Sequence, residues 1–333
     1  MPTRIVEGGL GALAVVLLAG GLSGALRSMD PAPGAAARSD RDPADTRGTS
    51  APATVSVAPF RSSTSTWTCG PGPRRLSEMD VAPDGYRKAV PGPATRPHQF
   101  YLARAMYTGF RGRGFWGGGG DGLGDRGPAW SIDYPRADRV MTRVATRLSS
   151  LDACEWELPI SLADPDLRRY PFLYSLEWGY ADLTDAEITG LREYLFAGGF
   201  LMLDDFWGDG EWRNFAAQMN RVLPGHAIVE VPRDHAVFRS YYELEEEILQ
   251  VPNVGNGRDI AAGWPGASAS ECGPCRAELH GIFDENGRLI VAINWNTDLG
   301  DALEWAESPS YPLVYSTFAS RLFLNLIIYA MAY

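Results

Sequence analysis

The sequence predicts a mixed α/β fold: a doubly wound, mostly parallel sheet with helices on both faces and an added β-hairpin. Two observations predict it. Residues 170–205 read strand, helix, strand with short connections, which is typical of a βαβ unit with parallel strands. The two strands, "YPFLYSLEWG" and "FLMLDD", are nearly continuous apolar runs, as expected of strands buried on both faces.

The first 26 residues predict a membrane anchor. Arg4 precedes a stretch without charged residues from Gly8 to Leu26, which is near the length needed to span a bilayer. We favour an uncleaved signal anchor over a cleaved signal peptide, and small residues in 34–40 leave cleavage and secretion as the alternative. No cysteine follows the apolar run directly, which disfavours a lipoprotein anchor.

Residues 27–96 predict a disordered linker, because they are rich in Pro, Ala, Ser, Thr and Arg and lack a periodic apolar pattern. The folded α/β body is then expected at 97–333. If the anchor inserts as expected, the linker holds the body on the extracytoplasmic side, in the periplasm or cell envelope.

The charge of the chain excludes several function classes. Residues 89–333 carry 20 Lys/Arg and 33 Asp/Glu, and so acidic a body repels the phosphates of nucleic acid. The sole lysine of the chain is Lys88. Schiff-base, pyridoxal-phosphate and P-loop chemistry each need a lysine within the folded body, so none of them is expected.

The first half of the body contains the βαβ unit. A capping box of Thr184 and Glu187 begins its helix, and Gly198 ends that helix. The elements expected in this half are a strand in 98–107, a helix in 137–151, a strand in 170–179, the capped helix and a strand in 200–205.

The second half is expected to begin with a helix at Asp209 or Gly210, followed by a short strand in 227–231. Residues 278–296 read as a hairpin that turns at Asp284–Gly287. The last segment, 311–333, is strongly apolar but is interrupted by Arg321 and Asn325. We interpret it as a helix packed on the sheet, with a second membrane span as the less favoured alternative.

Parallel strands bring their carboxyl ends to one edge of a sheet, where ligands bind. Polar and aromatic side chains follow several of the expected strands, and such a crevice can hold Mg²⁺, Ca²⁺ or a polyhydroxylated ligand. The candidate crevice residues are Asp204, Asp205, Trp207, Glu177, Asp298, Asp133, His235 and Asn296, and further acids nearby are Asp301 and Glu304.

Two of these acids, Asp204 and Asp205, are adjacent in one strand and therefore point to opposite faces. We expect one to face the crevice while the other binds loop amides or caps a helix. Two local caps without any ligand are the alternative. Arg104, inside the first strand, is expected to be buried and to pair with one of the crevice aspartates.

The histidine of "RDHAVF", His235, has two interpretations. It is either a general base beside an acid or, as we favour, a residue that binds the backbone to fix a loop.

The "CGPC" segment, Cys272 to Cys275, matches the active-site tetrapeptide of thioredoxins, but a strand rather than a helix is expected after it. We favour a local disulfide between Cys272 and Cys275 in an oxidising compartment, with redox catalysis as an alternative. Zinc is disfavoured, because the two cysteines and His280 do not complete a set of four ligands.

The segments "DYPRAD", "YPFLY", "LREYLFAGGFLMLDDF", "DHAVF" and "NTDLGDALEW" together resemble the bacterial domain of unknown function 4159 family over about 98–333. The resemblance implies a class I glutamine-amidotransferase-like, flavodoxin-like fold. It also implies an association with envelope proteins of von Willebrand factor A type. Since the turn after "FLMLDD" holds no cysteine, the amidotransferase mechanism is expected to be absent.

The sequence therefore predicts a non-catalytic, envelope-associated domain that binds a ligand or protein partner. The alternatives are a metal-assisted hydrolase of a glycan or ester that uses the acidic crevice, and a redox protein that uses Cys272 and Cys275.

Overall fold

A computed structural model describes residues 100–109, 128–154, 156, 158–244 and 248–333 of the 333-residue chain. The expected anchor in 1–26 and linker in 27–96 lie outside the described residues.

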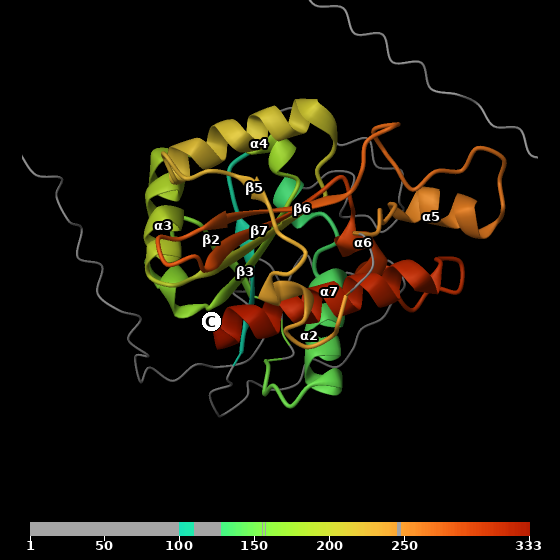
Figure 1. Ribbon diagram of the computed structural model, residues 1–333, viewed down its shortest axis with the longest axis horizontal. Coiled ribbons are helices and arrows are strands. Elements are labelled where there is room, and N and C mark those ends of the chain that lie inside the picture. The colour runs from blue at the N-terminus through green and yellow to red at the C-terminus, as the bar shows by residue number, and fades with distance from the viewer. Residues whose placement is uncertain (1–99, 110–127, 155, 157, 245–247) are drawn as a thin grey trace, which may run out of the picture. The chain divides into compact units, whose positions relative to one another are not determined.

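The described residues form a seven-stranded sheet in the order β2-β1-β3-β4-β7-β6-β5 (Figure 1). The first five strands of this order run parallel, whereas β6 and β5 join antiparallel. A mixed α/β fold with a mostly parallel sheet is thus confirmed. The strands are β1 (Leu102–Met106), β2 (Leu158–Ser161), β3 (Phe172–Leu176), β4 (Phe200–Asp204), β5 (Val229–Glu230), β6 (Glu278–Phe283) and β7 (Leu289–Trp295).

Helices cover both faces of the sheet (Figure 1). α3 (Asp185–Phe196) and α4 (Gly208–Val222) pack on one face, and α2 (Arg136–Leu148) and α7 (Leu313–Ala332) pack on the other. Successive strand residues alternate between the two cores, as the strand pleat requires. Phe172 and Tyr174 of β3 lie in the core beneath α7, whereas Leu173 between them lies in the core beneath α3 and α4.

The expected βαβ unit is present as β3–α3–β4, and Phe172 pairs in register with Phe200. The predicted capping box also forms, with Thr184 accepting from the Glu187 amide while the Glu187 side chain accepts from the Thr184 amide. The expected hairpin is present as β6–β7, and β7 also pairs in parallel with β4. The edge strand β2 escaped the sequence analysis because it is only four residues long and contains Pro159.

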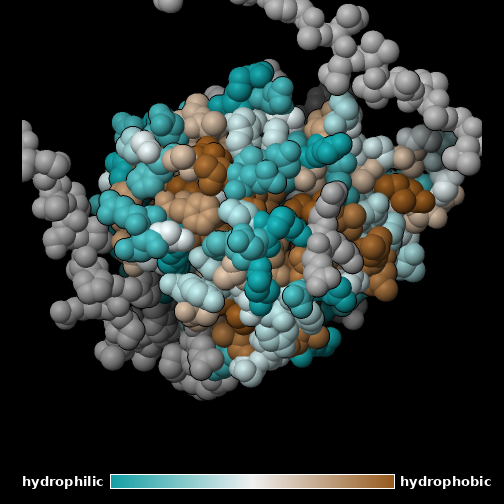
Figure 2. Space-filling view, in the orientation of Figure 1, coloured by the Kyte–Doolittle hydropathy of each residue, from teal (hydrophilic) through white to brown (hydrophobic). Residues whose placement is uncertain are grey.

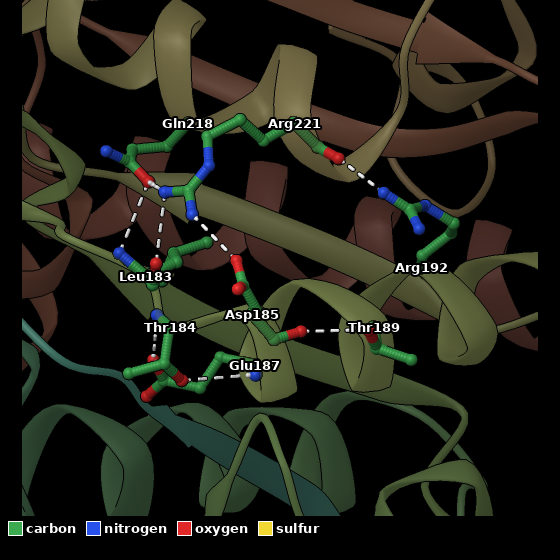
Figure 3. A network of polar contacts seen from close by, with 8 residues as sticks. All are labelled: Leu183, Thr184, Asp185, Glu187, Thr189, Arg192, Gln218 and Arg221. Carbon is green, nitrogen blue, oxygen red and sulfur yellow. Dashed lines mark hydrogen bonds and ion pairs between the residues drawn. The ribbon is translucent and has the colours of Figure 1, made fainter.

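Side-chain hydrogen bonds join α3 to α4 (Figure 3). The Arg221 guanidinium donates to the Leu183 carbonyl at 3.0 Å, to Gln218 Oε1 at 2.8 Å and to Asp185 Oδ1 at 3.3 Å. Arg192 donates from Nε to the Val222 carbonyl at 2.7 Å. These bonds fix the two helices that flank β4.

The apolar C-terminal helix, α7, is long and apolar enough to cross a membrane, yet 61% of its most apolar window is buried inside the protein. The polar Asn325 within it is satisfied there, since its amide donates to the Val237 and Tyr242 carbonyls and accepts from the Tyr242 amide. On the face shown in Figure 2, hydrophobic residues are interspersed with hydrophilic ones.

Candidate metal centre

Four parallel strands, β1, β3, β4 and β7, end at one edge of the sheet, and the backbone there is unusual. The non-glycine residues with positive φ in the described part of the chain are Asp133 (60°), Glu177 (57°), Asp205 (49°) and Asn296 (60°). Glu177 and Asn296 directly follow β3 and β7, Asp205 follows β4, and Asp133 lies between β1 and α2. Left-handed side-chain-bearing residues cost about 1–3 kcal/mol each and concentrate at functional sites.

Three carboxylates meet at this edge. One oxygen from each of Asp133, Asp205 and Asp298 lies within 4.8 Å of the other two. The three residues are only 8, 6 and 3% exposed, respectively. Asp133 Oδ2 is buried without a hydrogen-bond partner, although buried carboxylate oxygens are normally satisfied. The arrangement therefore offers convergent oxygen ligands in a site that is largely shielded from water.

A second group shares Asp133 and adds Asp301 and Glu304. Asp301 already holds two segments together, because its oxygens accept from the indole of Trp305 at 3.1 Å and from the amide of Val254. This places the first residues of α5 (Val254–Ala261) beside α6 (Leu299–Glu304). Asp298 also caps α6, since its Oδ1 accepts from the Asp301 amide at 2.7 Å. Because both oxygens of Asp301 accept hydrogen bonds, whereas Asp298 accepts through Oδ1, we take Asp133, Asp205 and Asp298 as the better candidate ligand set.

The adjacent acids of β4 have different surroundings. Asp204 is fully buried, and its Oδ2 accepts from the Gly300 amide at 2.9 Å and from the Tyr174 hydroxyl at 3.2 Å. Burial raises the pKa of Asp204 to about 7. Asp205 instead stands with Asp133 and Asp298, and its Oδ1 accepts from the Trp207 indole at 2.8 Å. One acid thus binds a helix amide while its neighbour faces the cluster.

Burial raises the pKa of Asp133, Asp205 and Asp298 well above the usual aspartate range, and neighbouring carboxylates raise it further. Burial also dominates at Glu177, where the Asp205 charge is the next contribution and the pKa is again raised. Several negative charges at this distance repel one another in a poorly solvated site. The cluster therefore favours protons or a bound cation over the fully ionised, unliganded state.

Asn296 acts as a brace beside these acids. Its Oδ1 accepts from the Gly208 amide at 2.8 Å, and its Nδ2 donates to the Arg276 carbonyl at 2.8 Å. The side chain thereby links the end of β7 to the start of α4 and to the loop before β6. Both ends of the amide are engaged, so Asn296 positions the site.

The sequence of residues 122–331 matches the model of a protein family described as Domain of unknown function (DUF4159). This match covers more than half of the chain. The chain belongs to the DUF4159 family. A search of curated proteins finds no match.

The structure bears on two expectations for this DUF4159 domain: His235 takes the favoured loop-fixing role, and the expected partner of Arg104 is wrong. His235 does not join the acids: its ring packs against Phe283 and Tyr329, and Nδ1 accepts from the Val237 amide at 3.3 Å. This is the loop-fixing role, and burial lowers its pKa. His235 is remote from the acids because Phe283 pairs with Leu289 at the start of β7, whereas the acids follow the ends of the parallel strands.

The partner of Arg104 is Asp138 rather than a crevice aspartate. Both side chains are fully buried, and the guanidinium also stacks on the Tyr174 ring at 4.3 Å from its centroid. Asp138 lies in the first turn of α2, 32 residues after the end of β1 at Met106, so its position relative to strand ends could not indicate it. The direct ion pair of Arg104 is thus with Asp138, and at Asp133 its charge only partly opposes the rise in pKa that burial and the neighbouring acids cause.

The disulfide between Cys272 and Cys275 is present, and β6 rather than a helix follows it, as the sequence predicts. No sequence pattern indicated two residues near the site, Glu271 and Gly300. Glu271 precedes the disulfide, and its negative charge raises the pKa of Asp205. A Cβ at Gly300 would stand 2.1 Å from Asp133 Oδ2. The position of Glu271 before "CGPC" was a usable signal, whereas nothing local distinguishes Gly300.

Proposed function

We propose that this domain binds a divalent cation through Asp133, Asp205 and Asp298, and that cation binding serves a non-catalytic role in recognising a ligand or partner at the cell envelope. The observation that carries the proposal is the buried convergence of three carboxylates, one of which has an oxygen without a hydrogen-bond partner. A cation compensates their mutual repulsion and satisfies that oxygen.

Hard, oxygen-preferring cations suit this ligand set. Ligands on opposite sides of Ca²⁺ are about 4.6 to 5.2 Å apart, and those across Mg²⁺ about 4.0 to 4.2 Å apart. The oxygens of the three aspartates lie within 4.8 Å of one another, which is compatible with either ion once water completes the shell. Ca²⁺ and Mg²⁺ are therefore both proposed.

We further propose a flavodoxin-like, amidotransferase-like fold for this domain. The strand order β2-β1-β3-β4-β7 has the pattern of a flavodoxin-like sheet, with β7 in the place of the fifth strand. The amidotransferase-like assignment adds a nucleophile position after a central strand, and Asp205 would occupy it in this chain. The disulfide-bonded state of Cys154, Cys272 and Cys275 is consistent with an extracytoplasmic domain held by an N-terminal anchor, with envelope proteins of von Willebrand factor A type as partners.

Metal-assisted hydrolysis of a glycan or ester is the second candidate. It is favoured by the left-handed Asp205 at the strand-to-helix turn, the position that carries the nucleophile in related sheet architectures. A cation beside that residue would activate a water molecule. Cation-dependent release of a chromophore from aryl esters or aryl glycosides, lost in Asp205→Asn, would select this candidate over the non-catalytic one.

Thermal unfolding of the full chain in mild detergent, after treatment with EDTA, tests cation binding. We expect Ca²⁺ or Mg²⁺ at about one hundred times its Kd to raise Tm by roughly 5 to 10 °C. Asp205→Asn and Asp298→Asn should abolish this rise without lowering Tm in EDTA, because each removes a repelling charge. Asp209→Asn, at an exposed position in the first turn of α4, is the matched control and should retain the rise.

A cation-induced rise of equal size in Asp205→Asn, Asp298→Asn and the control would contradict the proposed ligand set. A lower Tm in EDTA for both cluster variants, with no cation effect in any protein, would instead make these residues structural caps.

A further inference from the structure

Three acids follow one another along the short helix α6 beside Asp133. Asp298 is the N-cap of this helix, and Asp301 and Glu304 come three and six residues later. Residues three apart in a helix are neighbours on one face. One oxygen from each of Asp133, Asp301 and Glu304 lies within 4.8 Å of the other two. Asp133 therefore belongs both to this group and to the ligand set that it forms with Asp205 and Asp298.

The group of Asp133, Asp301 and Glu304 is buried, since the three residues are 8, 7 and 6% exposed, respectively. Asp133 Oδ2 has no hydrogen-bond partner among the described residues. This oxygen lies against the first turn of α6, where a Cβ at Gly300 would stand 2.1 Å from it. The unpartnered oxygen is therefore directed at the helix that carries Asp301 and Glu304.

Asp301 is held in position by hydrogen bonds from two other residues. Its Oδ1 accepts from the Trp305 indole at 3.1 Å, and its Oδ2 accepts from the Val254 amide. Carboxylates that ligate metals are commonly hydrogen-bonded in this way, and such bonds orient the ligand. The bonds also compete with a cation for the oxygens, so this group should bind a cation more weakly than Asp133, Asp205 and Asp298 do.

The electrostatic repulsion at Asp133 comes mainly from the same helix. After burial, the charges of Asp301 and Glu304 contribute most to the raised pKa of Asp133, and that of Asp205 comes next. A cation bound among Asp133, Asp205 and Asp298 leaves the two larger repulsions without a cation between the charges. A cation between Asp133 and the two acids of α6 would offset them.

We propose a second cation site formed by Asp133, Asp301 and Glu304. The first cation site is the set of Asp133, Asp205 and Asp298, so the Asp133 carboxylate bridges two hard divalent cations. Cations in such paired sites are about 3.5 to 4 Å apart. Water completes both coordination shells. This inference rests on the proposed cation binding at the first site.

The two sites should fill in order. Asp133 Oδ2 receives no hydrogen bond from the residues that the structure describes, so the cation of the first site orients this carboxylate for the second. Repulsion between two divalent cations weakens the second binding step. Loss of the first site should therefore empty both, whereas loss of Glu304 should empty the second alone.

Equilibrium dialysis and calorimetric titration of the full chain in mild detergent, after treatment with EDTA, count the bound cations. Ca²⁺ and Mn²⁺ are the probes, because carboxylates and water suit both ions. We expect the wild type to bind two cations, the second about 10- to 1,000-fold more weakly than the first. Glu304→Gln should bind one cation with the wild-type affinity of the first site, and Asp205→Asn should bind neither at the concentrations that fill both sites of the wild type.

Glu307→Gln is the matched control, because it makes the same change three residues further along, where the side chain is 68% exposed. This variant should bind two cations like the wild type. Asp301→Asn removes the other carboxylate that α6 contributes to the second site, and it replaces Glu304→Gln as the test variant if that protein does not fold.

Electron paramagnetic resonance of bound Mn²⁺ gives a measurement on the wild type itself, whatever the folding of the variants. Two Mn²⁺ ions that share a carboxylate are magnetically coupled, so their signal differs from that of an isolated ion. We expect the coupled signal in the wild type and in Glu307→Gln, and the signal of an isolated ion in Glu304→Gln.

One bound cation with the signal of an isolated ion in the wild type would overturn the second site and leave the proposed function intact. Two cations with a coupled signal in Glu304→Gln would overturn Glu304 as a ligand. If the wild type binds no cation, the proposed function fails and this inference fails with it.

Discussion

At the residue scale, the missing side chain of Gly300 leaves the space that the Asp133 carboxylate occupies. Asp133 adopts a left-handed backbone and presents Oδ2 toward Gly300, where a Cβ would approach to 2.1 Å. The Tyr174 hydroxyl would lie 2.9 Å from the same Cβ. Residue 300 must therefore lack a side chain if Asp133, Tyr174 and the Asp204 carboxylate are to keep their positions around the first turn of α6.

Gly300→Ala is expected to lower the free energy of unfolding by about 1–3 kcal/mol, because the added methyl overpacks a buried site. It should also remove the cation-induced rise in Tm by displacing Asp133. Urea unfolding with and without Ca²⁺ measures both effects. The matched control is Gly210→Ala in α4, where an added Cβ meets nothing within 4 Å and should stabilise by about 0.5–1 kcal/mol. Wild-type behaviour of Gly300→Ala would show that Asp133 is not held against α6.

The start of α3 shows at the element scale how one carboxylate fixes several segments. Glu187 Oε2 accepts from the amide and hydroxyl of Thr184, at 2.8 and 2.9 Å, within the capping box. Its Oε1 accepts from the amide and hydroxyl of Thr108, at 2.8 and 3.0 Å, in the loop after β1. Glu187 therefore joins the helix of the βαβ unit to the exit of the neighbouring strand, close to the edge that carries the acids.

Thr184→Ala should lower the free energy of unfolding by about 1 kcal/mol, the usual value of an N-cap. Glu187→Ala should cost more, about 2 kcal/mol or above, because it leaves the Thr108 amide without its acceptor as well. Chemical denaturation of each variant measures these losses. Thr189→Ala, at an exposed position within α3, is the control and should stay within about 0.5 kcal/mol of wild type. Equal losses in Glu187→Ala and Thr184→Ala would show that the link to β1 contributes no stability.

At the scale of the whole molecule, the buried carboxyl groups determine how the stability of the fold depends on pH. Asp133, Glu177, Asp205 and Asp298 all have raised pKa values, and the pKa of Asp204 is raised to about 7, with burial as the first cause in every case. A raised carboxyl pKa means that the folded chain keeps protons that the unfolded chain releases above about pH 4. These groups therefore make folding less favourable as pH rises from about 4 through 7.

In EDTA, Tm should accordingly be higher near pH 5 than near pH 8, and saturating Ca²⁺ or Mg²⁺ should reduce the difference by neutralising the ionised cluster. Differential scanning calorimetry at matched ionic strength measures this dependence. Asp298→Asn removes one of the raised groups, so its Tm should fall less over the same range. A Tm in EDTA that increases steadily from pH 5 to pH 8 would contradict the burial of ionisable acids at this site.

Local sequence patterns predicted most of the helices and strands. The capping box of Thr184 and Glu187, the apolar β3 and β4, and the β6–β7 turn each carry their signal within a few residues. Strand β2 and helix α6 are short and lack such a signal, and Asp138 was missed as the partner of Arg104 because the pair is 34 residues apart. Sequence alternation separated Asp204 from Asp205 but did not indicate which of them faces the cluster.

By itself, the sequence determined the α/β class, the family, the parallel βαβ unit and the set of acids that follow strand ends, because all of these depend on periodicity, caps and order along the chain. Only the tertiary structure decided which acids meet. Asp133, Asp205 and Asp298 come from three separate connections, and the parallel alignment of β1, β4 and β7 brings them together. His235 instead lies against Phe283, which pairs with Leu289 at the start of β7, whereas these acids follow the ends of the parallel strands.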